Sequence, residues 1–275
     1  MSVAVFRVRA VHSETRGEGT PLVLIHGFGV DHRILLPLDE TIAAHGGWRR
    51  IYVDLPGMGQ TPIGEVASTE DVARALTDAV REAVGDEPFA VLGNSYGGML
   101  ARRLAHDFGE QVLGLATLAG VFVAKHGART APPRTVLHEE PALFDGVPEK
   151  TATGYRDFAV WQSAAGLANY VETVEPGVEA IDQPALERIA QNYAFDVEPE
   201  DAASGPFTKP ALFVVGRQDE VVGYVDAWRR LEHYPRASFL VLDAAGHNII
   251  GEQFGLVGAA VTEWLERIRR DSASR

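Results

Sequence analysis

The chain contains no cysteine among its 275 residues. This absence excludes disulfide bonds, thiol catalysis and cysteine metal sites. Basic residues are also scarce, with 25 Lys and Arg against 38 Asp and Glu, which gives a formal net charge of −13. A charge of this sign argues against nucleic acid or an anionic membrane surface as a partner, and it favours solubility.

Long apolar runs are missing as well. No run approaches the roughly 18 residues needed to cross a membrane, so we expect no membrane insertion. Residues 1–10 alternate apolar and polar side chains and lack the apolar block of a signal peptide, so we expect a cytoplasmic protein. The histidines form no H-x-H or H-x-x-x-H pair, and the Gly57-x-Gly59 pair is too short for a dinucleotide loop. We therefore predict neither a metal ion nor a cofactor.

The most informative segment that is present is Gly93-Asn94-Ser95-Tyr96-Gly97. It follows an apolar run at 89–92 and opens a helical pattern at 99–105, which places Ser95 at a strand-to-helix corner. The glycines allow the chain to reverse sharply there, and the first amides of the helix face a developing anion. This is how an enzyme presents a nucleophile. For the pentapeptide alone, a glycine-rich turn with an exposed serine remains the alternative.

Three other predicted strands also end in residues suited to acyl transfer. One is followed by a glycine turn in which the Phe28 amide can point at the same anion. Another is followed by Asp219, and a third by a loop of small residues that ends in His247, the natural general base. Asp243 is the alternative acid, but it ends its strand four residues before the histidine and points across to it less readily. We therefore predict that Asp219 orients His247.

The order of nucleophile, acid and histidine, each after a predicted strand, resembles that of the α/β-hydrolase fold family. The likeness extends over nearly the whole chain. The segments that carry it are His26-Gly27-Phe28-Gly29, 54–59, 93–98, 216–219 and Gly246-His247. It implies an α/β fold with a mostly parallel central sheet, helices on both faces and an inserted, mainly helical lid. It also implies a serine hydrolase.

The distribution of apolar runs along the chain favours the same architecture, because strands alternate with helical patterns. Strands are expected near 3–10, 21–26, 49–54, 88–93, 112–119, 210–216 and 237–242. The two best-marked helices run from an N-cap at Ser68 to Gly85 and over residues 254–268. Between 122 and 208 this rhythm stops, so the resemblance divides the chain into a core, 1–121 and 209–275, and a lid, 122–208.

A lid over Ser95 would supply most of the surface that faces the substrate. Its aromatic residues are therefore the substrate-binding candidates, namely Tyr155, Phe158, Trp161, Tyr170 and Tyr193. The alternative for each of them is packing of the lid onto the body.

The predicted chemistry is acyl transfer in two steps. His247 takes the proton of Ser95, whose hydroxyl attacks a carbonyl, and the backbone N–H groups of Phe28 and Tyr96 hold the oxyanion. Asp219 keeps the imidazole in the useful tautomer. Water then repeats the attack on the acyl-enzyme.

The substrate is less well defined, because esterases, thioesterases, lactonases and carbon–carbon bond hydrolases share these residues. A small carboxylic ester is the first choice. Residues 93–95 and 216–219 also resemble hydrolases of aromatic ring-fission products, but Asn248 stands where those enzymes commonly carry a bulky residue. A serine at the elbow argues against the dehalogenases and epoxide hydrolases of this fold. A small-molecule receptor on a hydrolase body is the alternative of another class, and a homodimer is compatible with the sequence.

Overall fold

A seven-stranded sheet forms the centre of the molecule in the computed structural model, which describes residues 11–273. The strand order is β1-β3-β2-β4-β5-β6-β7, and β1 pairs antiparallel whereas the remaining pairs are parallel. The strands are β1 Ser13–Arg16, β2 Thr20–Ile25, β3 Trp48–Val53, β4 Phe89–Asn94, β5 Val112–Leu118, β6 Ala211–Gly216 and β7 Ala237–Leu242. Six of the predicted strands are thereby confirmed, and the strand expected at 3–10 lies outside the described residues.

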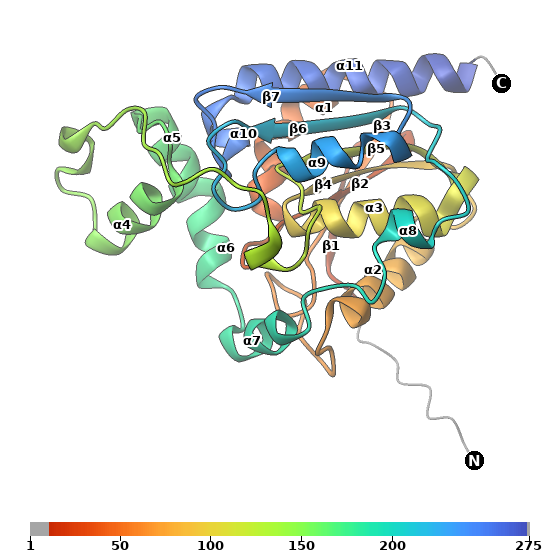
Figure 1. The fold of residues 1–275 in the computed structure, drawn as a ribbon, viewed down its shortest axis with the longest axis horizontal. Coiled ribbons are helices and arrows are strands. Elements are labelled where there is room, and N and C mark those ends of the chain that lie inside the picture. The colour runs from red at the N-terminus through yellow and green to blue at the C-terminus, as the bar shows by residue number, and fades with distance from the viewer. Residues whose placement is uncertain (1–10, 274–275) are drawn as a thin grey trace.

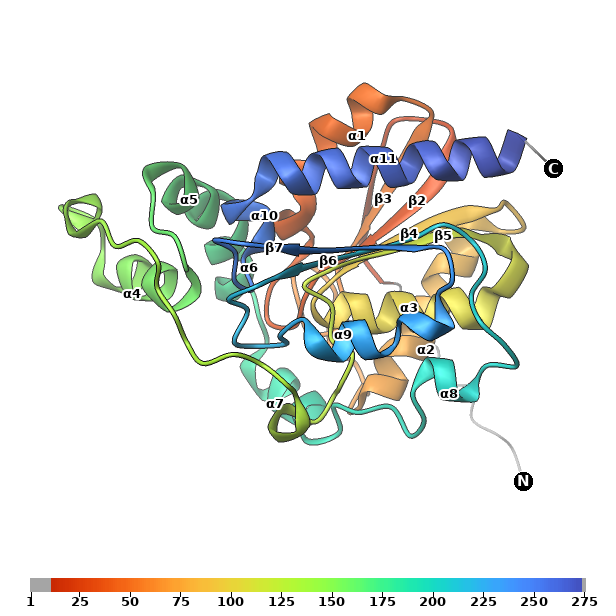
Figure 2. The same cartoon turned by 45° about the horizontal axis from the view of Figure 1, so that its top comes forward.

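Helices cover both faces of this sheet, as the sequence predicted. The α-helices are α1 Asp39–His45, α2 Thr69–Val84, α3 Tyr96–Phe108, α4 Glu149–Phe158, α5 Ala164–Asn169, α6 Glu175–Glu179, α7 Gln183–Gln191, α8 Pro199–Ala202, α9 Val225–Arg229, α10 Ile249–Glu252 and α11 Phe254–Ala273. Figure 2 shows α1 and α11 on one face and α2, α3 and α9 on the other. The inner strands β4 and β6 are buried at every residue because their sequences are almost wholly apolar. None of the helices within residues 11–273 is long and apolar enough to cross a membrane.

Helix α2 begins where its capping residues predict. The Ser68 side chain accepts a hydrogen bond from the Asp71 N–H at 3.2 Å, and the Asp71 carboxylate accepts one from the Ala67 N–H at 3.0 Å. This reciprocal pattern satisfies N–H groups that a helix leaves without partners at its start. Gly85 follows the last residue of the helix with φ +56°, a conformation that glycine adopts without strain.

The chain between β5 and β6, residues 119–210, is called the β5–β6 segment below. It contains α4 to α8, and α4 and α5 lie to one side of the sheet, away from its body (Figure 1). Strand–helix alternation stops in this segment, as the sequence indicated. The finer division into a core and a lid with limits at 122 and 208 stays a prediction.

A buried ion pair fastens the C-terminal part of this segment to α3. The Arg102 Nε and Nη2 atoms lie 2.6 and 2.5 Å from the two carboxylate oxygens of Glu200, and the Tyr234 hydroxyl donates to Glu200 at 2.5 Å. Both charged side chains are fully buried. Burial opposes ionisation, but the Arg102 charge dominates and lowers the pKa of Glu200 to about 2.

Candidate active site

Ser95 lies at the corner between β4 and α3, with backbone angles φ 52° and ψ −115°. This left-handed conformation is costly for a residue with a Cβ atom and turns the side chain out of the sheet. The chain passes so close to β2 that a Cβ atom on Gly97 would lie 2.2 Å from the Ile25 carbonyl oxygen. Glycine is therefore required at position 97, as the motif indicated.

The structure brings His247 and Asp219 to this serine. The His247 Nε2 atom lies 2.8 Å from Ser95 Oγ, and its Nδ1 atom lies 3.0 Å from Asp219 Oδ2. The other carboxylate oxygen of Asp219 accepts the N–H groups of Val221 and Val222 at 2.9 and 3.0 Å. Asp219 is fully buried, so its second oxygen is held facing the imidazole. A carboxylate on Nδ1 favours the tautomer whose Nε2 accepts a proton from serine.

The Asp243 side chain does not meet His247. Its Oδ1 atom accepts a hydrogen bond from Gln218 Nε2 at 2.8 Å, on the exposed side of the loop. The geometry therefore favours Asp219 over Asp243 as the partner of the imidazole.

The turn after β2 lies against Ser95. A Cβ atom added to Gly27 would lie 3.2 Å from Ser95 Cβ, so the Phe28 backbone follows directly from a point of close approach. The Phe28 N–H has no hydrogen-bond acceptor within residues 11–273. Tyr96 is the first residue of α3, where helical N–H groups have no partner within the helix. Neither N–H group thus has an acceptor in the described part of the chain, and their role in holding a substrate oxyanion stays a prediction.

His26 holds this turn in place. Its Nδ1–H donates to the Gly27 carbonyl oxygen at 2.7 Å, and its Nε2 accepts the Leu55 N–H at 2.9 Å. Both bonds together require the neutral ring. Burial lowers the pKa of His26, which favours that form. The histidine of the His26-Gly27 motif therefore positions backbone and takes no direct part in proton transfer.

A cavity of about 650 Å³ opens on Ser95 and His247. Its wall is mainly apolar, with a cationic stretch on one side. The lining residues are Phe28, Ser95, Val121, Ala124, Lys125, His126, Arg129, Ala190, Gln191, Tyr193, Ala194, Val221 and His247. A concave, mostly apolar site with a few converging polar groups is typical of a small-molecule pocket.

Tyr193 is the predicted aromatic residue that lines this cavity. Its ring packs edge-on against Phe28 and also contacts Tyr96, with centroids 5.4 and 5.0 Å apart. Its carbonyl oxygen accepts the Thr69 hydroxyl at 2.7 Å, which ties this part of the β5–β6 segment to α2.

The other four aromatic candidates do not line this cavity, which corrects their assignment to it. Tyr155 is fully buried among the helices of the β5–β6 segment, and its hydroxyl accepts the Ser163 N–H at 3.1 Å. Tyr170 packs against Tyr155 and Phe158. Trp161 is 45% exposed and stacks on His138. Tyr155, Phe158 and Tyr170 pack the segment's own helices together, because short helices without a sheet behind them need large side chains for a core.

Sequence reasoning missed Glu252, which joins the His247 loop to the β5–β6 segment. Its carboxylate accepts the Gly246 N–H at 2.6 Å and the N–H groups of Val160 and Trp161 at 2.5 and 3.1 Å. Burial outweighs these bonds and raises the pKa of Glu252. The only signal in the sequence is its place five residues after His247, and its two partners in the β5–β6 segment lie about 90 residues away in the chain.

A cluster elsewhere has the atom types of a metal site. The ligand atoms of Asp31, His32 and Asp54 lie within 4.8 Å of one another. However, the Arg33 guanidinium binds both oxygens of Asp31, and Asp54 accepts the His32 ring and the Gln60 N–H at 2.7 and 2.9 Å. The atoms that could bind a metal are thus already engaged in hydrogen bonds within the protein. These bonds stabilise the loops after β2 and β3.

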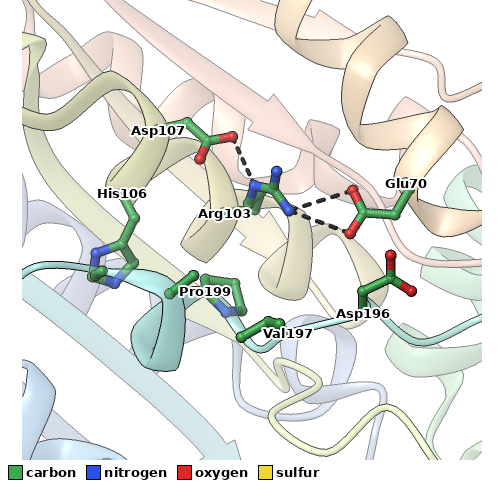
Figure 3. Close-up of a pocket in the computed structure, with 9 residues that line it drawn as sticks. Glu70, Arg103, His106, Asp107, Asp196, Val197 and Pro199 are labelled. Carbon is green, nitrogen blue, oxygen red and sulfur yellow. Dashed lines mark hydrogen bonds and ion pairs between the residues drawn. The ribbon is translucent and has the colours of Figure 1, made fainter.

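Figure 3 shows a second cavity, of about 310 Å³, between α2, α3 and the chain around α8. Its central cation is Arg103, whose Nε atom lies 2.7 Å from Asp107 and whose Nη1 atom lies 3.4 Å from Glu70. Arg103 therefore faces three carboxylates, Glu70, Asp107 and Asp196, and the cavity has a net negative charge. Neither Ser95 nor His247 lines it.

Comparison with known proteins agrees with this arrangement. A family model described as the alpha/beta hydrolase fold matches residues 20–194. The chain belongs to the α/β-hydrolase fold family. One curated relative, a pimeloyl-[acyl-carrier protein] methyl ester esterase of Shewanella woodyi, is 33% identical over 265 residues, covering 94% of this chain and 98% of that protein. A protein of the same name from Aliivibrio fischeri is 29% identical and covers 86% of this chain and 90% of its own length.

Solved structures show the same fold. An alpha/beta superfamily hydrolase from Oenococcus oeni matches with a TM-score of 0.87 and 26% identity, covering 94% of this chain and 96% of that one. An esterase from Exiguobacterium antarcticum matches with a TM-score of 0.71 at 16% identity, covering 93% and 95% of the two chains. The family model and the curated esterases together show that this α/β-hydrolase is an enzyme of the esterase type.

Proposed function

We propose that this hydrolase cleaves a small carboxylic ester through Ser95, His247 and Asp219. The observation that carries the proposal is the continuous chain of contacts from Ser95 Oγ to His247 Nε2 at 2.8 Å and from His247 Nδ1 to Asp219 Oδ2 at 3.0 Å. A nucleophile, a base and a group that orients the base are the parts that serine-based acyl transfer requires.

In the first step, His247 Nε2 takes the Ser95 proton while Oγ attacks the ester carbonyl carbon. The negative charge that develops on the carbonyl oxygen is held by the N–H groups of Phe28 and Tyr96. The tetrahedral intermediate then expels the alkoxide, which receives the proton from His247. An acyl ester of Ser95 and a free alcohol result.

In the second step, His247 takes a proton from water, and the hydroxide attacks the acyl-Ser95 carbonyl. Collapse of this intermediate breaks the bond to Oγ, which recovers its proton from His247, and the carboxylic acid leaves. Asp219 stabilises the imidazolium in both steps without accepting its proton.

Two observations support the proposed substrate class. The cavity is mainly apolar and about 650 Å³ in volume, which suits a small acyl chain. The curated relatives are named as methyl ester esterases, so we carry over the ester bond and not their particular substrate. The cytoplasmic location and the homodimer stay predictions.

The test is hydrolysis of p-nitrophenyl butyrate together with active-site labelling by a fluorophosphonate. Ser95→Ala should abolish turnover and labelling while circular dichroism stays unchanged, and mass analysis should find the label on Ser95. Ser204→Ala is the matched control, because Ser204 is exposed and does not line the cavity at Ser95. Labelling of another residue, or binding of the ester without turnover, would contradict the proposal; the second result favours a receptor.

A pair of asparagine variants tests the choice of acid. Asp219→Asn should lower kcat by about 10⁴-fold, because the amide stabilises the wrong tautomer of His247. Asp243→Asn should leave kcat unchanged, since that side chain contacts Gln218 instead. Equal losses in the two variants would rule out Asp219 as the orienting acid.

A further inference from the structure

The cavity at Ser95 has a cationic stretch for which the proposed ester hydrolysis has no use. Lys125, His126 and Arg129 lie together in its wall, around a 3₁₀ turn at His126–Ala128. No Asp or Glu belongs to the lining. This local charge stands out in a chain whose net charge is −13.

Arg129 makes many hydrogen bonds but has no counter-charge. Its guanidinium donates to the carbonyl oxygens of Val123, Ala124 and Val221 at 2.8, 3.1 and 3.0 Å. Among the residues that the structure describes, no carboxylate lies within ion-pair distance of it. Carbonyl oxygens thus accept three of its five N–H groups and fix its position, yet they leave its positive charge in place. Two of these bonds hold the chain before the 3₁₀ turn, and the third holds the loop after Asp219.

Lys125 is exposed at the cavity wall and likewise lacks a carboxylate partner in the described part of the chain. Three cations elsewhere in the molecule do have carboxylate partners. Lys150 pairs with Glu179 at 2.7 Å, Lys209 pairs with Glu110 at 2.6 Å, and Arg103 in the second cavity pairs with Asp107 and Glu70 (Figure 3). Among the residues that the structure describes, Arg188 and Arg217 also form no ion pair, but they do not line this cavity. What distinguishes the cavity at Ser95 is that Arg129 and Lys125 line it together without an acidic residue.

We propose that the substrate of this hydrolase is an ester whose end remote from the scissile bond carries an oxyanion, a carboxylate or a phosphate, and that this group binds beside Arg129 and Lys125. The inference rests on the proposed function, because it concerns the substrate of the same site. A fixed guanidinium and an exposed ammonium at a partly apolar wall attract an anion more strongly than the same groups in open water. The apolar part of the wall then contacts the chain between the two ends of the substrate.

The test compares two esters of equal chain length, p-nitrophenyl hexanoate and mono-p-nitrophenyl adipate, which ends in a carboxylate. The measured quantity is the ratio of kcat/KM for adipate to that for hexanoate. Wild type should prefer the adipate. Arg129→Gln should lower the ratio about 10-fold, since a charge-assisted hydrogen bond is lost. Lys125→Met should lower it about 3-fold, and less in 1 M NaCl, because this side chain is exposed.

Lys150→Met is the matched control and should leave the ratio unchanged, because Lys150 is outside the cavity lining. A third ester that ends in a phosphate tells the two anions apart, since the better of the two charged substrates identifies the preferred group. If Arg129→Gln does not fold, Lys125→Met decides the outcome, because its ammonium makes no contact on which the fold depends.

A wild-type preference for hexanoate over both charged esters, or a ratio unchanged in the folded variants, would overturn this inference while the proposed ester hydrolysis stands. Failure of wild type to hydrolyse even the hexanoate would instead remove the proposed function, and this inference with it.

Discussion

Two carboxylates in opposite electrostatic settings, one fully buried and one partly buried, join the β5–β6 segment to the rest of the molecule. Near the C-terminal end of the segment, Glu200 meets the guanidinium of Arg102 through two short contacts. Near its middle, Glu252 of α10 accepts backbone N–H groups only. The pKa of Glu200 is accordingly lowered by its cation, whereas burial raises the pKa of Glu252. The first contact secures the fold, and the second joins the segment to the loop of His247.

The largest expected effect is on stability at Glu200. Glu200→Gln leaves Arg102 as a buried charge with no full partner, which should cost about 3–5 kcal/mol of unfolding free energy. Urea denaturation measures this loss. Glu198→Gln is the control, because its carboxylate lies 3.2 Å from the same arginine but is partly exposed and should cost about 1 kcal/mol or less. Equal losses of unfolding free energy in Glu200→Gln and Glu198→Gln would contradict the special role of the buried pair.

A smaller effect on stability, joined to one on activity, is expected at Glu252. In Glu252→Gln one acceptor oxygen is replaced by a donor that faces an N–H group, at a cost of about 1–3 kcal/mol. Because Gly246 precedes His247, kcat/KM for a neutral ester should also fall by about 10-fold, whereas Glu200→Gln should leave it nearly unchanged. Steady-state kinetics on both variants checks this. Unaltered kinetics in Glu252→Gln would show that the contact is purely structural.

The two carboxylates should also respond oppositely to acid. The pKa of Glu200 is about 2 in the fold against an ordinary value of 4.5, so its contribution is fully present above about pH 4.5 and is lost as the pH falls toward 2. Because the pKa of Glu252 is raised, folding takes up a proton there, and stability rises as the pH falls through that pKa. Urea midpoints from pH 7 to pH 3 should therefore depend less on pH below 4.5 in Glu200→Gln, and more steeply just above 4.5 in Glu252→Gln.

The smallest effect on stability is expected at Tyr155, whose contacts lie within the β5–β6 segment and not between this segment and the rest of the molecule. Tyr155→Phe removes the acceptor of the Ser163 N–H and should cost about 0.5–1.5 kcal/mol without changing kcat. Tyr193→Leu should instead raise KM, because that ring lines the cavity. A rise in KM in Tyr155→Phe would restore Tyr155 as a substrate-binding candidate.

The parts of this molecule that the sequence predicted depend on short-range chemistry. Apolar runs locate β2 to β7, Ser68 locates the start of α2, and the glycines around Ser95 are required by a turn within the same few residues. Ser95, Asp219 and His247 each follow a strand of one sheet, so parallel pairing alone brings them to one edge.

The contacts of the β5–β6 segment could not be predicted in this way. Whether Tyr155 packs inside a lid or faces a pocket depends on how the short helices are oriented, and its residue type suits both roles. Two of the three N–H groups that Glu252 accepts lie 91 and 92 residues away, and the partners of Arg129 include a carbonyl 92 residues away. Nearly every residue type has the same backbone N–H and C=O groups. The sequence therefore does not indicate which of these groups a distant side chain binds.

The left-handed backbone at Ser95 lowers the stability of the fold, because a residue with a Cβ atom is strained in this conformation. A glycine at position 95 would adopt φ 52° without strain, so Ser95→Gly should relieve the backbone strain of the folded state. The proposed function predicts that this variant is inactive. Under the proposed function, the loss of stability at Ser95 accompanies a nucleophile held in a fixed position.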